Sequence, residues 1–378
     1  MHFSKILYTV ALTPLFVLAS CSSGHASKSD DRDSLTIMVG SYSNPADTAL
    51  RVYSFNPEDN SASKVAALPV DNASFFTQSP KGIIYVLTET NSDSSRITAI
   101  APDRNEGGLK IIGSQLVGSD SPCYVTVSPD GRFAVTADYN GSTASVFPLD
   151  DNGSPLPLSK RLHFSGTGPD TARQEKPHPH CIAFTPDGRF MLVNDLGTDR
   201  IHMFPVDSAD CVNADRMTDI ALLPGSGPRH IVFNKKGNFG YLINEISDSV
   251  TVLSYNGETL QPVQYIVANT VRAQGAGDIH LSPDGRHLYA SLRLANEGIA
   301  KFEVDPETGL LTYCGHTPTP GHPRNFMITP DGTRMLVACR DADEVRIYTI
   351  DPESGALTDT GNSISVSRPV CVKTISVN

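Results

Sequence analysis

Residues 124–137, YVTVSPDGRFAVTA, contain two short runs rich in β-branched and aromatic residues, joined by the turn Ser128-Pro129-Asp130-Gly131. Proline is favoured at the second position of such a turn, and glycine at the fourth. Runs of this composition are typical of β-strands, and a tight turn between two of them makes a hairpin. The segment therefore predicts two antiparallel strands.

The same turn recurs along the chain at nearly constant spacing. The turn glycines are Gly82, Gly131, Gly188, Gly237, Gly285 and Gly332, of which Gly82 and Gly237 end weaker copies. They are 49, 57, 49, 48 and 47 residues apart. Each hairpin is followed by further apolar runs, for example residues 200–204 after the hairpin around Gly188. A repeat of this length, with four short strands in each unit, indicates a repeat fold built from four-stranded antiparallel sheets. No segment has the apolar spacing of a helix.

The two ends of the chain together supply one more unit. Residues 370–375 resemble the strand that precedes each turn, whereas residues 35–40 and 49–55 resemble the two strands that follow it. Pairing of the two ends would close a ring and leave no open sheet edge between them. Residues 35–378 divided among seven units give about 49 residues each, which matches the repeat. We therefore predict an all-β fold, a seven-bladed β-propeller of four-stranded antiparallel blades, closed by pairing of the N- and C-terminal strands in one blade.

The N-terminal segment resembles a targeting sequence rather than part of this fold. Lys5 precedes an apolar stretch, residues 6–18, that is too short to span a bilayer and leads into Leu18-Ala19-Ser20-Cys21. This pattern is typical of a bacterial lipoprotein signal, with a non-lipidated secretory peptide as the alternative. We expect residues 1–20 to be removed, residues 21–34 to form a flexible tether and residues 35–378 to form the propeller. The protein would then be exported and anchored to the cell envelope, at the periplasmic or outer-membrane face, only through a lipid on Cys21.

Composition argues against nucleic-acid binding. The formal net charge is −11, no basic run is longer than the pair Lys235 and Lys236, and the chain has no tryptophan for base stacking. Six cysteines follow Cys21, and none of them forms a C-x-x-C pair. We expect these six to be small buried hydrophobic residues rather than disulfides.

The geometry of a propeller indicates where a binding site should lie. In each blade the start of the innermost strand and the end of the antiparallel second strand meet at one rim of the central mouth. Eight residues before the turn glycines are Ser74, Cys123, His180, Arg229, Gly277 and Arg324, with Cys371 as the expected equivalent in the split blade. Seven or eight residues after them are Glu89, Asp138, Tyr139, Asp195, Asn244, Glu245, Arg293 and Arg340. Close to the same rim are His178, His230, His280 and His322.

These rim residues have two interpretations. Pairs of arginine and carboxylate can simply join neighbouring blades. Alternatively, several arginines and histidines gathered at the mouth of an acidic protein form a local site for an anion. We expect His280 to be a structural histidine.

Motifs spread over most of the chain carry a family resemblance. They are Gly166-Thr167-Gly168-Pro169, Arg173-Gln174-Glu175, His178-Pro179-His180, residues 195–201, Gly227-Pro228-Arg229-His230, residues 241–245, residues 282–285, residues 288–293 and residues 321–326. Their order resembles the seven-bladed propeller lactonase family, which includes bacterial 6-phosphogluconolactonase and fungal carboxymuconate cyclase. The similarity covers essentially all of residues 35–378 and implies a lactone hydrolase that needs no cofactor and no metal.

The resemblance implies that a histidine, a glutamate and arginines act on the lactone. Hydrolysis needs a base, donors for the oxyanion and an acid for the leaving alkoxide, and arginine cannot be the base. The expected catalytic residues are His180, Glu245, Arg229 and Arg293, where Glu245 or His180 activates water and the arginines stabilise the oxyanion. The expected substrate-binding residues are His178, His230, Arg324 and Arg340. His178 and His180 share a strand face, so either could point inward, although the register favours His180.

The substrate is expected to be a small lactone that carries negative charge. A phosphorylated sugar lactone is an intracellular metabolite, so export favours a carboxylated or neutral sugar lactone. The insertion at residues 150–177 should lie beside the mouth, where Arg173, Gln174 and Lys176 either select the substrate or form a solvated loop.

Three other functions fit the same pattern. His178, His180, His230 and Glu245 could bind the divalent metal of a metal-dependent lactonase. The propeller could also be a non-catalytic surface binding module, because a fold does not determine a function. A lactonising enzyme similar to carboxymuconate cyclase is the third alternative.

Overall fold

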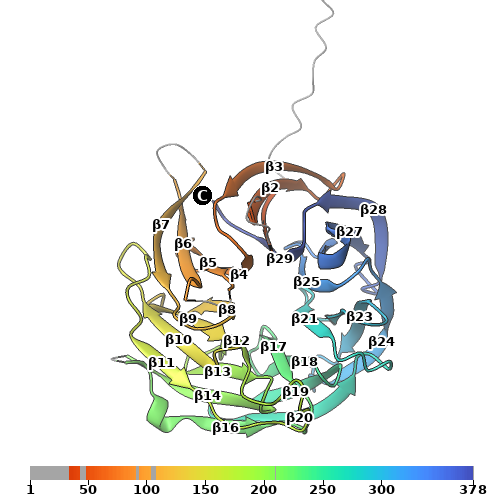
Figure 1. Ribbon diagram of the computed structural model, residues 1–378. Helices are drawn as coiled ribbons and strands as arrows, with labels where there is room; N and C mark the ends of the chain where they lie inside the picture. The colour runs from red at the N-terminus through yellow and green to blue at the C-terminus, as the bar shows by residue number, and fades with distance from the viewer. Residues whose placement is uncertain (1–33, 43–47, 91–92, 104–107, 209, 378) are drawn as a thin grey trace, which may run out of the picture. The chain divides into compact units, whose positions relative to one another are not determined.

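Figure 1 shows the computed structural model, in which residues 34–42, 48–90, 93–103, 108–208 and 210–377 are described. Seven antiparallel sheets stand around a central axis, so the predicted seven-bladed propeller is confirmed. The expected signal at residues 1–20, Cys21 and the tether up to residue 33 lie outside the described residues. No helix in the described ranges has the length and apolar composition needed to cross a membrane.

In six blades the strands run outward from the axis in chain order, and in the split blade the last strand of the chain is innermost. The split blade contains β29 (Pro369–Thr374), β1 (Leu35–Ser41), β2 (Leu50–Asn56) and β3 (Ser61–Leu68). The second blade contains β4 (Ala73–Gln78), β5 (Ile84–Thr88), β6 (Arg96–Pro102) and β7 (Leu109–Leu116). The third blade contains β8 (Pro122–Val127), β9 (Phe133–Asp138), β10 (Thr143–Pro148) and β11 (Lys160–His163). The fifth contains β17 (Pro228–Phe233), β18 (Phe239–Asn244), β19 (Ser249–Tyr255) and β20 (Leu260–Val267). The sixth blade contains β21 (Ala276–Leu281), β22 (His287–Leu292), β23 (Gly298–Val304) and β24 (Leu311–Pro318). The seventh blade contains β25 (Pro323–Ile328), β26 (Arg334–Cys339), the short helix η3 (Arg340–Ala342), β27 (Glu344–Ile350) and β28 (Leu357–Ser365).

The fourth blade departs from the expected four strands. It contains β12 (Pro179–Phe184), β13 (Phe190–Asp195), β14 (Arg200–Asp207), β15 (Cys211–Val212), η2 (Ala214–Arg216) and β16 (Thr218–Ala221). Both β15 and β16 pair with β14, so the outer strand is divided into two short pieces.

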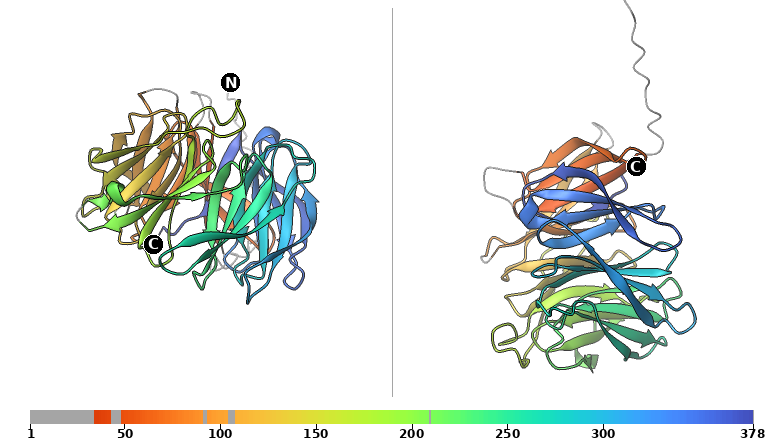
Figure 2. Two further views of the ribbon diagram at one scale, coloured as in Figure 1. Left: turned by 90° about the horizontal axis from the view of Figure 1, so that it is seen from below. Right: turned by 90° about the vertical axis from the view of Figure 1, so that its right-hand side faces the viewer.

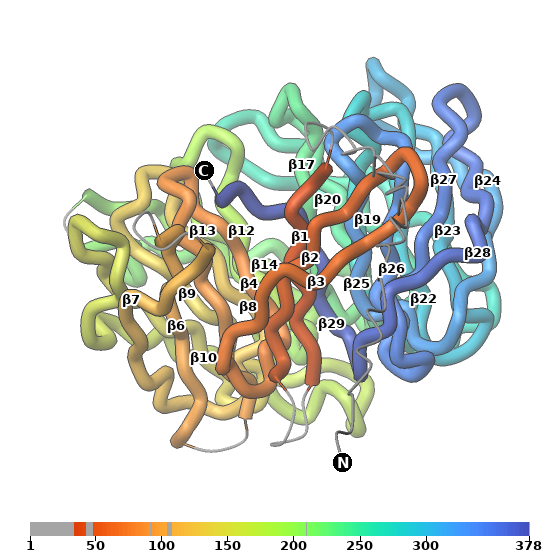
Figure 3. Tube along the Cα trace, turned by 90° about the horizontal axis from the view of Figure 1, so that it is seen from above, coloured from red at the N-terminus to blue at the C-terminus, as the bar shows by residue number. Residues whose placement is uncertain are grey.

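The ring closes in the split blade as predicted. β29 pairs antiparallel with β1, and Gly40 lies opposite Cys371. Figure 3 shows β29, at the blue end of the chain, running beside β1 at the red end. The backbone hydrogen bonds of this pair therefore join the first described strand to the last one.

The repeated turns have the geometry that their residues favour. In the first strong copy, the Gly131 amide donates to the carbonyl oxygen of Ser128 at 2.8 Å, and Gly131 has a φ of 70°. A left-handed backbone of this kind favours glycine, which explains why glycine ends each turn. The Ser128 hydroxyl also donates to Asp130 Oδ1 at 2.6 Å, which holds the turn in shape.

The core lies between neighbouring blades, whose sheets pack face to face (Figure 2). Second strands are therefore covered on both faces, and β9 and β22 are buried at every residue. One cluster joins Val135 and Val146 of the third blade to Ile182 and Val193 of the fourth. Burial on both faces explains why these strands read as continuous apolar runs instead of alternating ones.

A β-bulge stands at the start of each innermost strand. In all seven blades the pairing with the second strand shifts register directly after the first residue of the inner strand. Bulges of this kind redirect a side chain and are frequent beside active sites. The redirected residues include Cys123, His180, Arg229 and Arg324. In the split blade the bulged residue is Val370, so the expected equivalence of Cys371 was wrong by one position.

Candidate active site

The mouth of the propeller contains a cavity of about 370 Å³. Its lining residues are Glu89, Ser121, Cys123, Tyr139, Asn140, His180, Glu245, Arg293 and Arg324. They come from the second to seventh blades, and each lies at the start of an innermost strand or just beyond the end of a second strand. Four predicted site residues, His180, Glu245, Arg293 and Arg324, thus share one cavity.

A larger groove lies farther out on the fourth and fifth blades. Its volume is about 540 Å³, and Leu223, Ile246 and Arg272 are among its lining residues. Among the described residues its lining has no histidine and one carboxylate, Asp170, whereas the smaller central cavity combines a histidine with two carboxylates and is the better candidate for acid–base chemistry.

Glu245 holds three guanidinium groups together. Its Oε2 atom lies 2.9 Å from Nε of Arg229 and 2.9 Å from Nη2 of Arg293. Its Oε1 atom accepts a hydrogen bond from Nη2 of Arg173, which belongs to the insertion loop. Arg229, Arg293 and Glu245 are all buried. Charge-assisted contacts of this kind fix the positions of all three arginines.

The electrostatic result is a carboxylate that resists protonation. Burial alone would raise the pKa of Glu245, but Arg293, Arg229 and Arg173 outweigh it and lower the pKa to about 2. Burial, aided by the positive charge of Arg229, lowers the pKa of Arg293 to about 9, against the effect of Glu245. At neutral pH Glu245 is therefore ionised and Arg293 still carries its positive charge.

His180 is the histidine that lines the cavity. Its side chain is buried, and its Nδ1 atom has no hydrogen-bond partner among the described residues. Burial, together with the positive charges of Arg229 and nearby cationic groups, holds the pKa of His180 well below its usual value. The imidazole is therefore neutral at pH 7 and can donate or accept one hydrogen bond toward a ligand.

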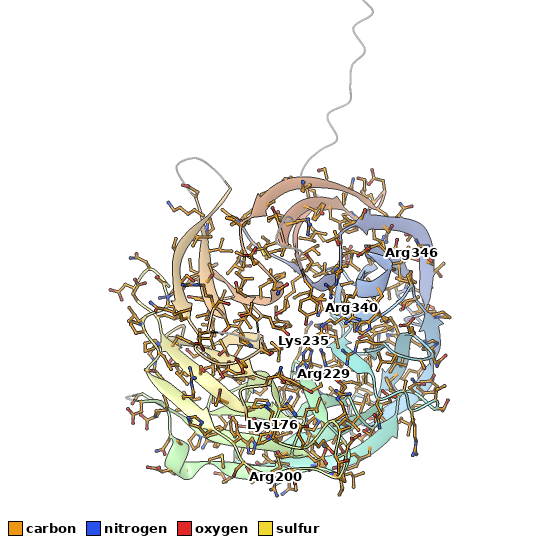
Figure 4. The ribbon with its side chains drawn as sticks, viewed as in Figure 1. Lys176, Arg200, Arg229, Lys235, Arg340 and Arg346 are labelled. Carbon is orange, nitrogen blue, oxygen red and sulfur yellow. The ribbon has the colours of Figure 1, made fainter. Side chains whose placement is uncertain are left out.

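Residues outside the cavity lining hold Arg229 in place. Neither Arg229 nor His230 belongs to the lining itself. Figure 4 shows Arg229 on the inner side of the ring, whereas Arg200 lies at the outer side. The His230 ring contacts Nη1 of Arg229 at 3.2 Å through Nε2 and Asp278 Oδ1 at 2.7 Å through Nδ1. The carbonyl of Gly277 also accepts from Arg229 Nη1 at 2.6 Å.

A second group of contacts joins Tyr42, Glu89 and Arg324 on another part of the rim. The Tyr42 hydroxyl donates to the Glu89 carboxylate, at 3.2 Å from Oε1 and 3.1 Å from Oε2. The same hydroxyl accepts from Nη2 of Arg324 at 2.9 Å. Three neighbouring blades are tied together in this way, because Tyr42 follows β1, Glu89 follows β5 and Arg324 lies in β25.

Three other residues of the expected rim do not line the cavity. His178 contacts the carbonyl oxygen of Tyr139 through Nδ1 at 3.1 Å and Glu175 through Nε2 at 3.2 Å. Arg340 opens the short helix η3 and pairs with Asp341 at 2.6 Å, and His322 Nδ1 lies 3.5 Å from the same carboxylate. His178 and Arg340 are therefore absent from the cavity lining, and their expected contact with substrate stays a prediction.

The expected alternative of a divalent metal site has little geometric support. Within the described ranges, no three His, Cys, Asp or Glu side chains are grouped as a metal would need. His178 is turned toward Glu175, and both oxygens of Glu245 face guanidinium groups. The six described cysteines are free thiols, four of them buried, and Cys123 lines the cavity.

Several residues of the cavity and its rim were missed from the expected site. Tyr42 touches both Glu89 and Arg324, yet no Pro-Asp-Gly turn precedes β1 from which its position could be counted. Counting along the repeat places Glu89 and Cys123 at the rim but assigns neither of them a role. Ser121 and Asn140 lie in loops beyond the strand ends, where the repeat gives no register.

Comparison with known proteins adds a family and its relatives. The family described as "Lactonase, 7-bladed beta-propeller" matches residues 36–374. The chain is 33% identical over 331 residues to the 6-phosphogluconolactonase of Formosa agariphila, and the match covers 85% of this chain and 94% of that protein. A solved candidate 6-phosphogluconolactonase of Bacteroides fragilis is 40% identical with a TM-score of 0.86, and the match covers 92% of this chain and 99% of that one. The solved periplasmic gluconolactonase of Pseudomonas aeruginosa is 29% identical with a TM-score of 0.85, covering 91% and 100%.

Proposed function

The chain belongs to the seven-bladed β-propeller lactonase family, and from this premise we propose that it hydrolyses the lactone of a sugar acid in its central cavity. The observation that carries the proposal is the lining of that cavity. It combines a charged arginine, Arg293, and a neutral histidine, His180, with two carboxylates, Glu89 and Glu245. These are the donors and acceptors that opening of a lactone requires.

The donors belong on the side where negative charge develops. When water attacks the lactone carbonyl, its oxygen becomes an oxyanion. Arg293 and His180 both line the cavity and can donate hydrogen bonds to that oxygen. The buried ion pair with Glu245 keeps the Arg293 guanidinium in place before the substrate binds. Preorganised donors of this kind are worth about 3 kcal/mol each in comparable sites.

We propose a neutral aldonolactone, such as D-glucono-1,5-lactone, as the substrate. The support is the export expected from the N-terminal sequence and the name of one solved relative, and this substrate differs from the charged lactone expected from the sequence. The Pseudomonas relative is named a periplasmic gluconolactonase, whereas the Formosa relative is named a 6-phosphogluconolactonase.

We also propose that the protein is a lipoprotein of the cell envelope. The support is the sequence around Cys21, with an apolar stretch ending in Leu18-Ala19-Ser20 directly before it. The test is the substitution Cys21→Ser. It should move the protein from the membrane fraction to the soluble fraction and abolish labelling by a radioactive fatty acid, and an unchanged distribution would overturn the anchor.

Acid release by the purified full-length protein tests the activity. The lactones are D-glucono-1,5-lactone, its 6-phosphate and a lactone with a free carboxylate, each with and without EDTA. We expect release above spontaneous opening, fastest on the neutral lactone and unchanged by EDTA. Loss of activity in EDTA that added metal restores would support a metal-dependent lactonase instead. A folded protein that accelerates none of the three would support the non-catalytic binding module.

A further inference from the structure

Two carboxylates line the cavity, and they face it from distant blades. Glu89 follows β5 in the second blade, and Glu245 follows β18 in the fifth. Three steps is the largest separation possible around a ring of seven blades, so the two groups approach a bound ligand from opposite sides.

Glu245 is poorly suited to take a proton. Both of its oxygens receive charged donors, Arg229 and Arg293 on Oε2 and Arg173 on Oε1. Lone pairs held in this way are not available to a water molecule, and cationic neighbours oppose protonation. Its contacts are those of an anchor for the arginines.

Glu89 has the opposite surroundings. Its carboxylate is half-buried, and the side-chain donor that reaches it within the described ranges is the Tyr42 hydroxyl, shared between Oε1 and Oε2. A carboxylate has about four lone-pair positions, so most of its accepting capacity remains for a ligand or water in the cavity.

Tyr42 is itself held in one orientation. Nη2 of Arg324 donates to the Tyr42 hydroxyl at 2.9 Å, and the guanidinium groups of Arg324 and Arg368 lie 5.3 Å and 5.6 Å from the centre of its ring. Because arginine can only donate, the hydroxyl proton of Tyr42 must point toward Glu89. Burial raises the pKa of Tyr42, so the hydroxyl keeps its proton.

His180 does not compete for this role. It is buried among positive groups that disfavour its protonation, and it faces the cavity from the fourth blade, two blades away from Glu89. The cavity thus has donors in His180, Arg293 and Arg324, and Glu89 is the carboxylate with accepting capacity to spare.

We propose that Glu89 is the general base that activates the hydrolytic water, with Tyr42 as its positioning residue and Glu245 as the anchor of the arginines. The assignment rests on the lactone hydrolysis proposed above. A water oxygen bonds to the lactone carbonyl carbon while its proton passes to Glu89, and the carbonyl π electrons move to the oxygen that faces Arg293 and His180. When the oxyanion re-forms the carbonyl, the ring C–O bond breaks and the alkoxide takes the proton from Glu89, which returns the carboxylate. The product is the open hydroxy acid.

The experiment measures kcat on D-glucono-1,5-lactone and the inhibition constant of gluconate for full-length wild-type protein and its Glu89→Gln variant. Loss of a general base lowers turnover by about 100-fold or more. We expect that loss in kcat with a change in gluconate inhibition below about threefold, because the amide keeps the shape of the side chain. Glu258→Gln, the same change at an exposed residue between β19 and β20, is the matched control and should leave both constants unchanged.

Two further variants separate chemistry from structure. Glu89→Ala should regain part of its turnover in formate, a small carboxylate that can replace the missing base, whereas wild type should gain nothing. Tyr42→Phe should lower kcat by about 10-fold, as expected when a hydrogen bond to a charged group is lost.

The outcomes distinguish the two proposals. If wild type is active and Glu89→Ala is inactive but regains turnover in formate, the result supports Glu89 as the general base. If wild type is active and the turnover of Glu89→Gln is within threefold of that of wild type, Glu89 is not the base, while lactone hydrolysis still stands. Wild type that accelerates no lactone overturns both.

Discussion

Nδ1 of His230 lies 2.7 Å from Oδ1 of Asp278, and this contact determines which of the two ring nitrogens near Arg229 Nη1 can accept a hydrogen bond from it. Asp278 is ionised, because its contacts with His280 and His230 outweigh burial and hold its pKa well below the usual value. A carboxylate only accepts, so Nδ1 of His230 must donate and Nε2 is left to accept from Arg229. The pKa of His230 is lowered to about 3, mainly by burial, which keeps this neutral form at neutral pH. A chain from Asp278 through His230 therefore positions the guanidinium that holds Glu245.

The first prediction tests that chain. His230→Phe removes the acceptor for Arg229 Nη1, and we expect kcat/KM to fall by about 10-fold to 100-fold, the usual cost of losing a hydrogen bond to a charged group. His230→Gln presents an amide oxygen to the same guanidinium and should recover most of that loss. Steady-state kinetics on D-glucono-1,5-lactone provide the check. Equal losses in the two variants would show that ring packing matters and the acceptor does not.

The second prediction concerns stability. Glu245→Ala leaves Arg229 and Arg293 buried side by side without their counter-charge. Removing one partner of a buried ion pair costs about 3 to 5 kcal/mol. Urea unfolding should show a loss of that size, whereas Glu58→Ala at an exposed position should stay within about 0.5 kcal/mol of wild type. An equally small loss for Glu245→Ala would mean that the arginines find other partners.

The third prediction is a pH dependence that follows from the same carboxylate. The pKa of Glu245 is lowered from 4.5 to about 2 in the folded protein, so the folded state favours the ionised form. The stability it adds is present above the unfolded pKa and is lost as pH falls through the folded pKa. At about 1.4 kcal/mol per pKa unit, Glu245 contributes about 3 kcal/mol that disappears between pH ~5 and pH ~2.

Glu245→Gln isolates this contribution, since all other titrating groups are shared. The difference in unfolding free energy between wild type and Glu245→Gln should shrink by about 3 kcal/mol over that pH range. A constant difference from pH ~5 to pH ~2 would contradict the lowered pKa.

The fold was predictable because its signals are local and repeated. The turn around Gly131 specifies a hairpin from four residues, and its recurrence specifies six of the seven blades. The closing strands, β29 and β1, could be matched by composition alone. The division of the outer strand of the fourth blade into β15 and β16 has no comparable signal, because an edge strand packs on one neighbour only and its composition is weakly constrained.

The site was predictable only where the repeat supplies a register. Counting from the turn glycines reached His180, Glu245, Arg293 and Arg324. It could not reach Tyr42, since no turn glycine precedes β1. Arg340 occupies an equivalent position, yet the chain there enters η3 and the neighbouring Asp341 captures its guanidinium.

Close packing beneath the cavity leads to the last prediction. A Cβ atom on Gly277 would lie 2.6 Å from Oγ of Ser291, 3.1 Å from the Arg324 carbonyl oxygen and 3.3 Å from Cδ of Arg293. Ser291 cannot withdraw freely, because its hydroxyl accepts from the Asp278 amide at 2.8 Å.

Gly277→Ala should therefore displace Arg293, and overpacking of this kind costs about 1 to 3 kcal/mol. We expect a loss of kcat that exceeds any change in the amount of folded protein, measured by circular dichroism and turnover on the same samples. Gly321→Ala is the matched control, because its nearest contact would be an ordinary 3.5 Å to Cβ of Asp341. If Gly277→Ala kept full turnover, the position of Arg293 would not matter for the reaction, and stabilisation of the oxyanion would have to come from His180.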